Sequence, residues 1–104
     1  MKNINLNFKE WFDKKNGNSY FCGTIKIDNN KTFLIPFQYG YGTQYLQECK
    51  NVLTEFNIIS CEYGKNLKAH CSDNNINLNI NFKDGCLKRE LKNIEKEYNN
   101  NLKQ

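Results

Sequence analysis

A chain of 104 residues is long enough for one domain with a single hydrophobic core and too short for two. Its formal net charge of +4 is moderate, which argues against a protein that binds duplex DNA mainly through its charge. No apolar run approaches the roughly 18 residues that cross a bilayer, so we expect no membrane-spanning segment and no membrane partner.

Residues 3–38 have the pattern of a three-stranded antiparallel meander. Residues 4–8 alternate apolar side chains with asparagine, which is the period of a half-buried strand. Asn16 and Gly17 form a dipeptide that is a strong hairpin signal. The return strand is expected at residues 20–27, followed by a second tight turn at residues 28–31, where asparagine tolerates a positive φ.

The third strand of the meander is indicated by Phe33, Ile35 and Phe37, which alternate again with other residues. Pro36 has no amide proton to donate to a sheet ladder, so its position predicts an edge strand or a strand end. We expect this strand to end near Gln38.

Residues 43–56 contain the best predicted helix. Its apolar residues recur at helical spacing and form one continuous stripe. The stripe consists of Tyr45, Leu46, Cys49, Val52, Leu53 and Phe56. We expect it to pack on the meander, with Tyr45 buried as its first member.

The second half of the chain is expected to add a strand–helix unit over residues 57–98. Residues 57–63 are interpreted as a short strand, residues 65–74 as a short helix, and residues 76–82 as another half-buried strand. A terminal helix follows and is expected to fray into residues 99–104. Its apolar stripe consists of Leu87, Leu91, Ile94 and Tyr98. These elements predict a single α+β domain: a three-stranded meander packed by an amphipathic helix, plus a further strand and a C-terminal helix.

Asparagine dominates the polar positions, and lysine outnumbers arginine fourteen to one, so any single Asn or Lys is weak support for a site. Residues 3–8 read NINLNF and residues 75–82 read NINLNINF. We attribute this similarity to composition and strand patterning, not to a duplicated unit.

The stretch PFQYGYGTQY, residues 36–45, is the main candidate binding site. Its candidate residues are Gln38, Tyr39, Gly40, Tyr41, Gly42, Thr43 and Gln44. In this hypothesis Tyr39 and Tyr41 stack on a ligand, Gln38 orients it, and backbone amides at the helix start hold a phosphate. The alternative is that the tyrosines fill the sheet edge, the glycines serve only the turn, and Thr43 is an ordinary N-cap.

Two other segments could contribute to the same site. Asn18 and Tyr20 lie where the first hairpin enters its second strand, and they would extend the polar-aromatic rim if the meander brings them beside the bend. The alternative, ordinary turn chemistry, also explains these residues. Arg89 and Lys92 on the terminal helix could hold a phosphate or an acidic partner, or they could belong to a solvated helix face.

Metal, thiol and catalytic chemistry have little support in the sequence. Four potential zinc ligands lack a short knuckle spacing: Cys61, His70, Cys71 and Cys86. No carboxylate pair stands out as acid and base, so we expect no enzyme, no metal and no cofactor. Residues 1–12 lack the apolar stretch of a signal peptide, which predicts a cytoplasmic protein whose five cysteines are reduced thiols.

Three segments carry a resemblance to small uncharacterised proteins of phages and prophages. They are NSYF, LIPFQYGYGTQY and, near the C-terminus, LNINFKDGCLKREL. The resemblance covers most of the chain, but its specific part is about twenty residues, and it brings no catalytic residues with it. It implies a viral or mobile-element origin, and phage accessory proteins of this size often antagonise host defence.

The leading hypothesis from these observations is a non-enzymatic binder of a nucleotide or another phosphate-bearing small molecule, which sequesters a host immune signal. The alternative is a direct protein inhibitor of a host defence complex, similar in role to an anti-CRISPR protein, which uses the same tyrosines. A third hypothesis is a single-stranded nucleic-acid binder, whose affinity would fall steeply with salt. A small binder of this kind can also close its pocket across a symmetric homo-oligomer.

Overall fold

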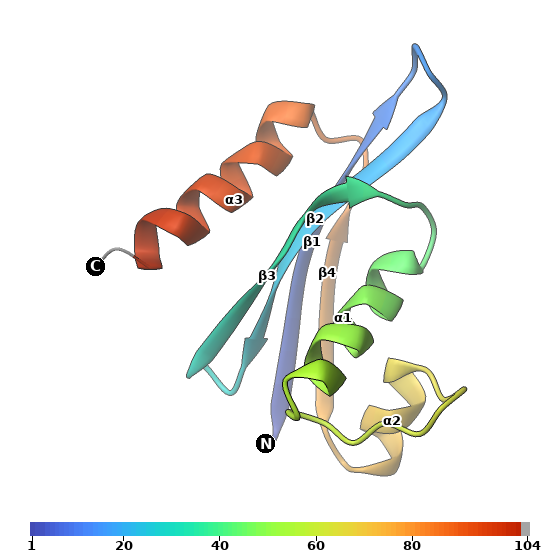
Figure 1. The fold of residues 1–104 in the computed structure, drawn as a ribbon, viewed down its shortest axis with the longest axis vertical. Helices are drawn as coiled ribbons and strands as arrows, with labels where there is room; N and C mark the ends of the chain where they lie inside the picture. The colour runs from blue at the N-terminus through green and yellow to red at the C-terminus, as the bar shows by residue number, and fades with distance from the viewer. Residues whose placement is uncertain (103–104) are drawn as a thin grey trace.

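The computed structural model describes residues 1–102 and confirms an α+β fold (Figure 1). Its elements are β1 (Asn3–Asp13), β2 (Asn18–Ile27), β3 (Lys31–Tyr39), α1 (Gln44–Glu55), α2 (Leu67–Asp73), β4 (Asn77–Lys83) and α3 (Lys88–Leu102). The strands form one sheet in the order β3-β2-β1-β4. None of the helices in residues 1–102 is long and apolar enough to cross a membrane.

The first three strands form the predicted antiparallel meander. Gly17, with a φ of 70°, closes the first hairpin, where its amide donates to the carbonyl of Asp13. Asp28 and Asn29 close the second hairpin with φ values of 47° and 64°, which short polar side chains tolerate better than most. The turn chemistry in the sequence therefore sets the register of both hairpins.

One face of the sheet holds the main hydrophobic core and is covered by α1 and α2. Apolar residues at alternate positions of the strands meet the buried stripe of α1 on this face. The fully buried members with the largest side chains include Ile4, Leu6, Phe21, Ile25, Ile35 and Leu53. Tyr45 is buried, as expected, and its ring stacks on that of Phe82 with the centroids 4.6 Å apart.

The other face of the sheet is covered by α3, which crosses it on the side opposite α1 (Figure 1). A smaller core consists of Cys22, Cys86 and Leu91, all buried. Two polar contacts attach α3 to the edge strand β3. The Glu95 carboxylate accepts a hydrogen bond from the Phe37 amide (2.9 Å), and the Tyr98 hydroxyl donates to the Thr32 carbonyl (3.3 Å).

The alternation of β3 breaks at Pro36 and Phe37. Gly23 of β2 pairs with Ile35, whereas Phe21 pairs with Gln38, so β3 carries one more residue than β2 over this stretch. Such a bulge reverses the facing of the residues that follow it. Phe33 and Ile35 therefore face the main core, while Phe37 packs on the α3 side. β3 is an edge strand, as Pro36 predicted.

β4 lies beside β1 and runs parallel to it. The two similar asparagine-rich segments are thus direct neighbours, with Ile4 opposite Leu78 and Phe8 opposite Phe82. Their apolar residues other than the exposed Ile80 belong to the main core or pack against it, and their asparagines line the opposite face.

Three predictions about the second half of the chain are wrong. Residues 57–63 are not a strand: Asn57 has a φ of 58°, and only Ile59 of this segment is buried in the main core. The terminal helix continues through Leu102 and does not fray at residue 99; Lys103 and Gln104 lie outside the described residues. Phe56 and Leu87 were expected in apolar stripes, but both lie at helix ends, where they are more than half exposed.

Candidate functional site: an aromatic strip on the α3 side

The bend between β3 and α1 occupies residues 40–43. Gly40 is buried, and a Cβ there would lie 2.5 Å from the Phe21 ring, so close packing requires this glycine. Its amide donates to the Ser19 carbonyl (3.0 Å), which extends the pairing of β2 and β3 by one residue. Gly42 has a φ of 63°, a conformation that glycine adopts without strain. Both glycines therefore have structural roles in the turn.

Tyr39 and Tyr41 do not fill the sheet edge. Their exposed fractions are 54% and 65%. The two rings meet nearly at right angles with centroids 6.4 Å apart, and Tyr39 meets Tyr20 in the same way at 5.9 Å. The meander thus brings Tyr20 beside the bend, so Tyr20 extends the aromatic surface of Tyr39 and Tyr41, as the sequence-based prediction of a shared site required.

Five aromatic residues form a continuous aromatic strip at the hairpin end of the α3 face: Trp11, Tyr20, Phe37, Tyr39 and Tyr41. Tyr20 stacks on Phe37 with centroids 5.1 Å apart, and Trp11 lies 5.3 Å from Tyr20. The inner three rings, Trp11, Tyr20 and Phe37, are half-buried, whereas Tyr39 and Tyr41 at the bend are exposed. The strip therefore has a packed base and an open outer end.

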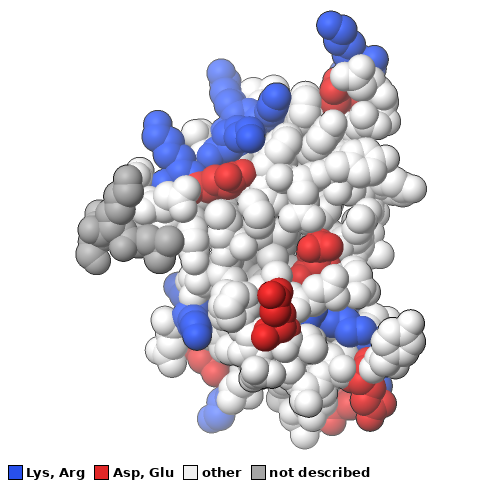
Figure 2. Space-filling view, in the orientation of Figure 1, with Lys and Arg blue, Asp and Glu red and all other residues white. Residues whose placement is uncertain are grey.

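Two lysines from the first turns of α3 complete the strip. The Lys92 ammonium lies 4.3 Å from the centroid of the Phe37 ring, and the Lys88 ammonium lies 5.4 Å from the Trp11 ring. Both distances suit a cation–π contact. Arg89 is exposed on the same helix, and Figure 2 shows lysine and arginine side chains gathered over α3. The strip is therefore bordered by positive charge.

Several predicted site residues do not belong to the strip. Gln38 pairs with Phe21, on the opposite face from Tyr39, and its side-chain amide donates to the Pro36 carbonyl (3.1 Å). Asn18 pairs with Asp13 at the hairpin end, on the same face of β2 as Tyr20. Thr43 occupies the N-cap position of α1, but its side chain makes no capping hydrogen bond. Gln38 therefore cannot orient a ligand that stacks on Tyr39.

The start of α1 is partly occupied by the turn itself. The Gln44 amide donates to the Tyr41 carbonyl (3.3 Å), and the Leu46 amide donates to the Thr43 carbonyl (2.9 Å). The Gln44 side chain packs beside Gly40. Fewer amides are therefore free for a phosphate than an open helix N-terminus offers.

Three residues of this site were not predicted as site residues from the sequence: Trp11, Phe37 and Lys88. Trp11 continues the alternation of β1 at odd positions, which is a signal that could have placed it on the α3 face. Phe37 reaches the strip only because of the bulge. Lys88 reaches it because α3 crosses the sheet, and no local pattern predicts that placement.

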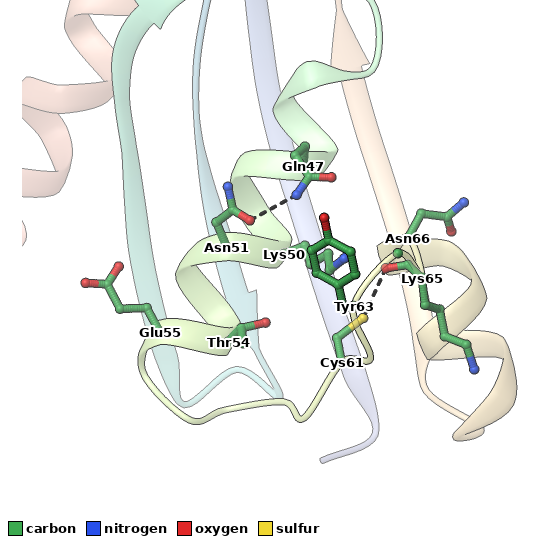
Figure 3. A pocket seen from close by; sticks show the side chains of 10 residues that line it. Gln47, Lys50, Asn51, Thr54, Glu55, Cys61, Tyr63, Lys65 and Asn66 are labelled. Carbon is green, nitrogen blue, oxygen red and sulfur yellow. Dashed lines mark hydrogen bonds between the residues drawn. The ribbon is translucent and has the colours of Figure 1, made fainter.

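A shallow hollow of about 690 Å³ lies elsewhere, between α1 and residues 61–66 (Figure 3). It contains none of the predicted site residues. Two hydrogen bonds join residues that line this hollow to one another. The Gln47 side-chain amide donates to the Asn51 side-chain oxygen (3.0 Å), and the Cys61 thiol donates to the Lys65 carbonyl (3.3 Å). Tyr63 lines it and is fully exposed.

The cysteines and the histidine lie apart from the aromatic strip's exposed end. Burial raises the pKa of the Cys22 thiol to about 12, and it also raises the pKa of Cys49 and Cys71. Buried thiols with raised pKa values stay protonated at neutral pH and are poor nucleophiles. Within residues 1–102, no group of three or more His, Cys, Asp or Glu side chains is placed to hold a metal ion.

Comparisons with known proteins add no assignment to this geometry. No family model, no curated protein and no solved structure matches the sequence.

Proposed function

We propose that this chain is a non-enzymatic binding protein that recognises an acidic surface of a partner protein through the aromatic strip. The observation that carries the proposal is the exposure of Tyr39 and Tyr41 at the open end of packed aromatic rings. Tyrosine offers a large, rigid contact area at low entropic cost, and tyrosines are enriched among the residues that dominate binding energy.

The contacts of the inner rings limit the aromatic faces on which a nucleobase could stack. Phe37 is already in contact with the Tyr20 ring and the Lys92 ammonium, and Tyr39 meets both Tyr20 and Tyr41. A base needs a free aromatic face on which to stack, whereas a protein surface can use ring edges and hydroxyl groups.

The charges around the strip favour an acidic partner. Lys88 and Lys92 border the inner rings, and Arg89 is exposed in the first turn of α3. Carboxylates on a partner would meet these cations at the rim of the contact, where charge complementarity raises the association rate and sets orientation. The resemblance to phage proteins supports a component of a host defence complex as this partner.

Site-specific photocrosslinking tests the proposal. A photoreactive phenylalanine analogue replaces Tyr41 in one variant and Tyr63 in a control variant, since Tyr63 is an even more exposed tyrosine on a different surface. In lysate of cells that naturally carry this sequence, we expect one protein to crosslink at position 41 and not at position 63.

The affinity of the purified pair then measures the contribution of the tyrosines. Tyr39→Ala combined with Tyr41→Ala should weaken binding by about 30-fold or more, which corresponds to the roughly 2 kcal/mol of a binding hot spot. Tyr63→Ala should leave the affinity unchanged. Crosslinking to nucleic acid at position 41, or an affinity that the double variant does not change, would overturn the proposal.

A further inference from the structure

A second surface on the α3 face has a different chemistry from the aromatic strip. A groove of about 480 Å³ lies between the sheet and the C-terminal half of α3. Its floor carries Lys9, Lys26 and Lys83, with Asn7 and Asn81 between them, and Tyr98 forms part of its wall. The volume lies within the range of about 300–1,000 Å³ that is usual for small-molecule sites.

Two lysines of this groove, Lys9 and Lys83, lie side by side on neighbouring strands. Lys9 and Lys83 are direct partners in the parallel ladder of β1 and β4, so their side chains leave the same face side by side. Like charges at such positions repel. The Glu90 carboxylate lies 3.9 Å from the Lys9 ammonium and offsets part of this charge. Glu90 thus supplies one negative charge beside the two positive charges of Lys9 and Lys83. The remaining positive charge favours binding of an added anion.

A third lysine lies toward the other end of the groove. Lys26 pairs with Asn5 on β1, four residues before Lys9, which corresponds to about 13 Å along the strand. Within residues 1–102, neither Lys26 nor Lys83 is in a salt bridge. Glu97 also lines the groove and is its only acidic lining residue in the described chain.

Free side-chain amides lie between the two groups of lysines. The asparagine ladder of β1 and β4 is bonded at its first two rungs, Asn77 to Asn3 (3.3 Å) and Asn79 to Asn5 (2.9 Å). At the third rung, Asn7 and Asn81 are partners in register, yet in the described structure neither side chain makes a hydrogen bond. Each amide therefore has a donor and an acceptor available inside the groove.

We infer that this groove binds a dinucleotide-sized ligand carrying at least two phosphates. Lys9 and Lys83 would hold one phosphate, Lys26 would hold another, and Asn7 and Asn81 would hydrogen-bond the sugar or base between them. This inference does not depend on the aromatic strip, which is formed by the opposite end of the sheet face and the first turns of α3.

The test is a titration of the ¹⁵N-labelled protein followed by NMR, with three probes: cyclic di-AMP, linear pApA and inorganic phosphate. At least one of the two nucleotides should shift the side-chain amide signals of Asn7 and Asn81, and it should bind at least tenfold more tightly than phosphate. No shift with any nucleotide at millimolar concentration, or equal affinity for phosphate, would overturn the inference.

Charge-removing variants separate this site from a general basic surface. Lys26→Gln and Lys83→Gln should each weaken nucleotide binding by about tenfold or more, because each removes a charge-assisted contact. Lys68→Gln on α2 removes the same charge elsewhere and should have no effect. The Tyr39→Ala, Tyr41→Ala double variant should also bind the nucleotide normally.

The melting temperature of the free protein provides an independent readout. Lys83→Gln removes the repulsion with Lys9, so it should raise the melting temperature by about 1–5 °C while it weakens ligand binding. A lower melting temperature together with unchanged nucleotide binding would contradict the role of Lys83.

Discussion

The two faces of the sheet differ in how completely they are covered. On the α1 face, apolar residues from all four strands and from both α1 and α2 form one continuous core. On the α3 face, the buried core has three members among the described residues, and aromatic rings lie at one end and lysines and asparagines at the other. The first face explains why the chain folds, and the second face carries the surfaces that packing alone does not explain.

Among the variants that test this difference, we expect the largest loss of stability from a substitution in the core under α1. Leu53 is fully buried among strands and helices, so Leu53→Ala should lower the free energy of unfolding by about 2–5 kcal/mol. Leu91→Ala removes an equally buried side chain from the smaller core under α3 and should cost less, because the surroundings there can collapse more easily. Urea denaturation of both variants measures the two losses. Equal losses of unfolding free energy in the two variants would contradict the difference between the two faces.

The attachment of α3 should give the next largest effect. Glu95→Ala leaves the Phe37 amide at the bulge without its acceptor, and we expect a loss of about 1–3 kcal/mol. Glu95→Gln keeps an acceptor oxygen and should lose less. The fluorescence of Trp11, the only tryptophan, should report a disturbed aromatic strip in the alanine variant. Equal stability of the alanine and glutamine variants would show that this hydrogen bond does not hold α3.

A smaller, pH-dependent effect is expected from Asp28, which lies at the end of the sheet. Hydrogen bonds from the backbone amides of Lys2 and Asn3 hold the pKa of its carboxyl below the usual value. A lowered pKa in the folded state means that the charged carboxylate stabilises the fold above about pH 4, and that this stabilisation is lost as the pH falls further.

The Asp28→Asn variant isolates this contribution. Asparagine tolerates the positive φ at this position, so the turn should be retained. The wild type should be more stable than the variant at neutral pH, and the difference should diminish as the pH falls below about 4. Thermal melts over this range measure it, and a difference that is independent of pH would contradict the role of the carboxylate.

Much of the α1 face could be predicted from the sequence because its signals are local. Alternating apolar residues, Asn-Gly and Asn-rich turns and the stripe of residues 45–53 act within a few positions of the chain. The same local patterns predicted β4, but periodicity does not say which strand is the neighbour. The parallel pairing with β1 therefore could not be predicted, and neither could the groove that it creates.

The candidate site could be predicted only in part. The bend itself stood out because Tyr39 and Tyr41 had no place in a core, and both are exposed. The extra residue at Pro36 and Phe37 shifts the register of β3. Pro36 predicted an edge strand, but a proline in a strand is compatible with an edge or a bulge, so the facing of Phe37 was not predicted. The contribution of α3 depends on long-range packing of Leu91 on the sheet, which has no local signature.

Hydrogen exchange of the protein with and without its crosslinked partner tests the central claim most directly, namely that the α3 face is the binding face. We expect the partner to slow exchange at residues 37–41 and 88–92, and to leave residues 61–66 beside α1 unchanged. Slower exchange at residues 61–66, with no change at residues 37–41, would contradict it.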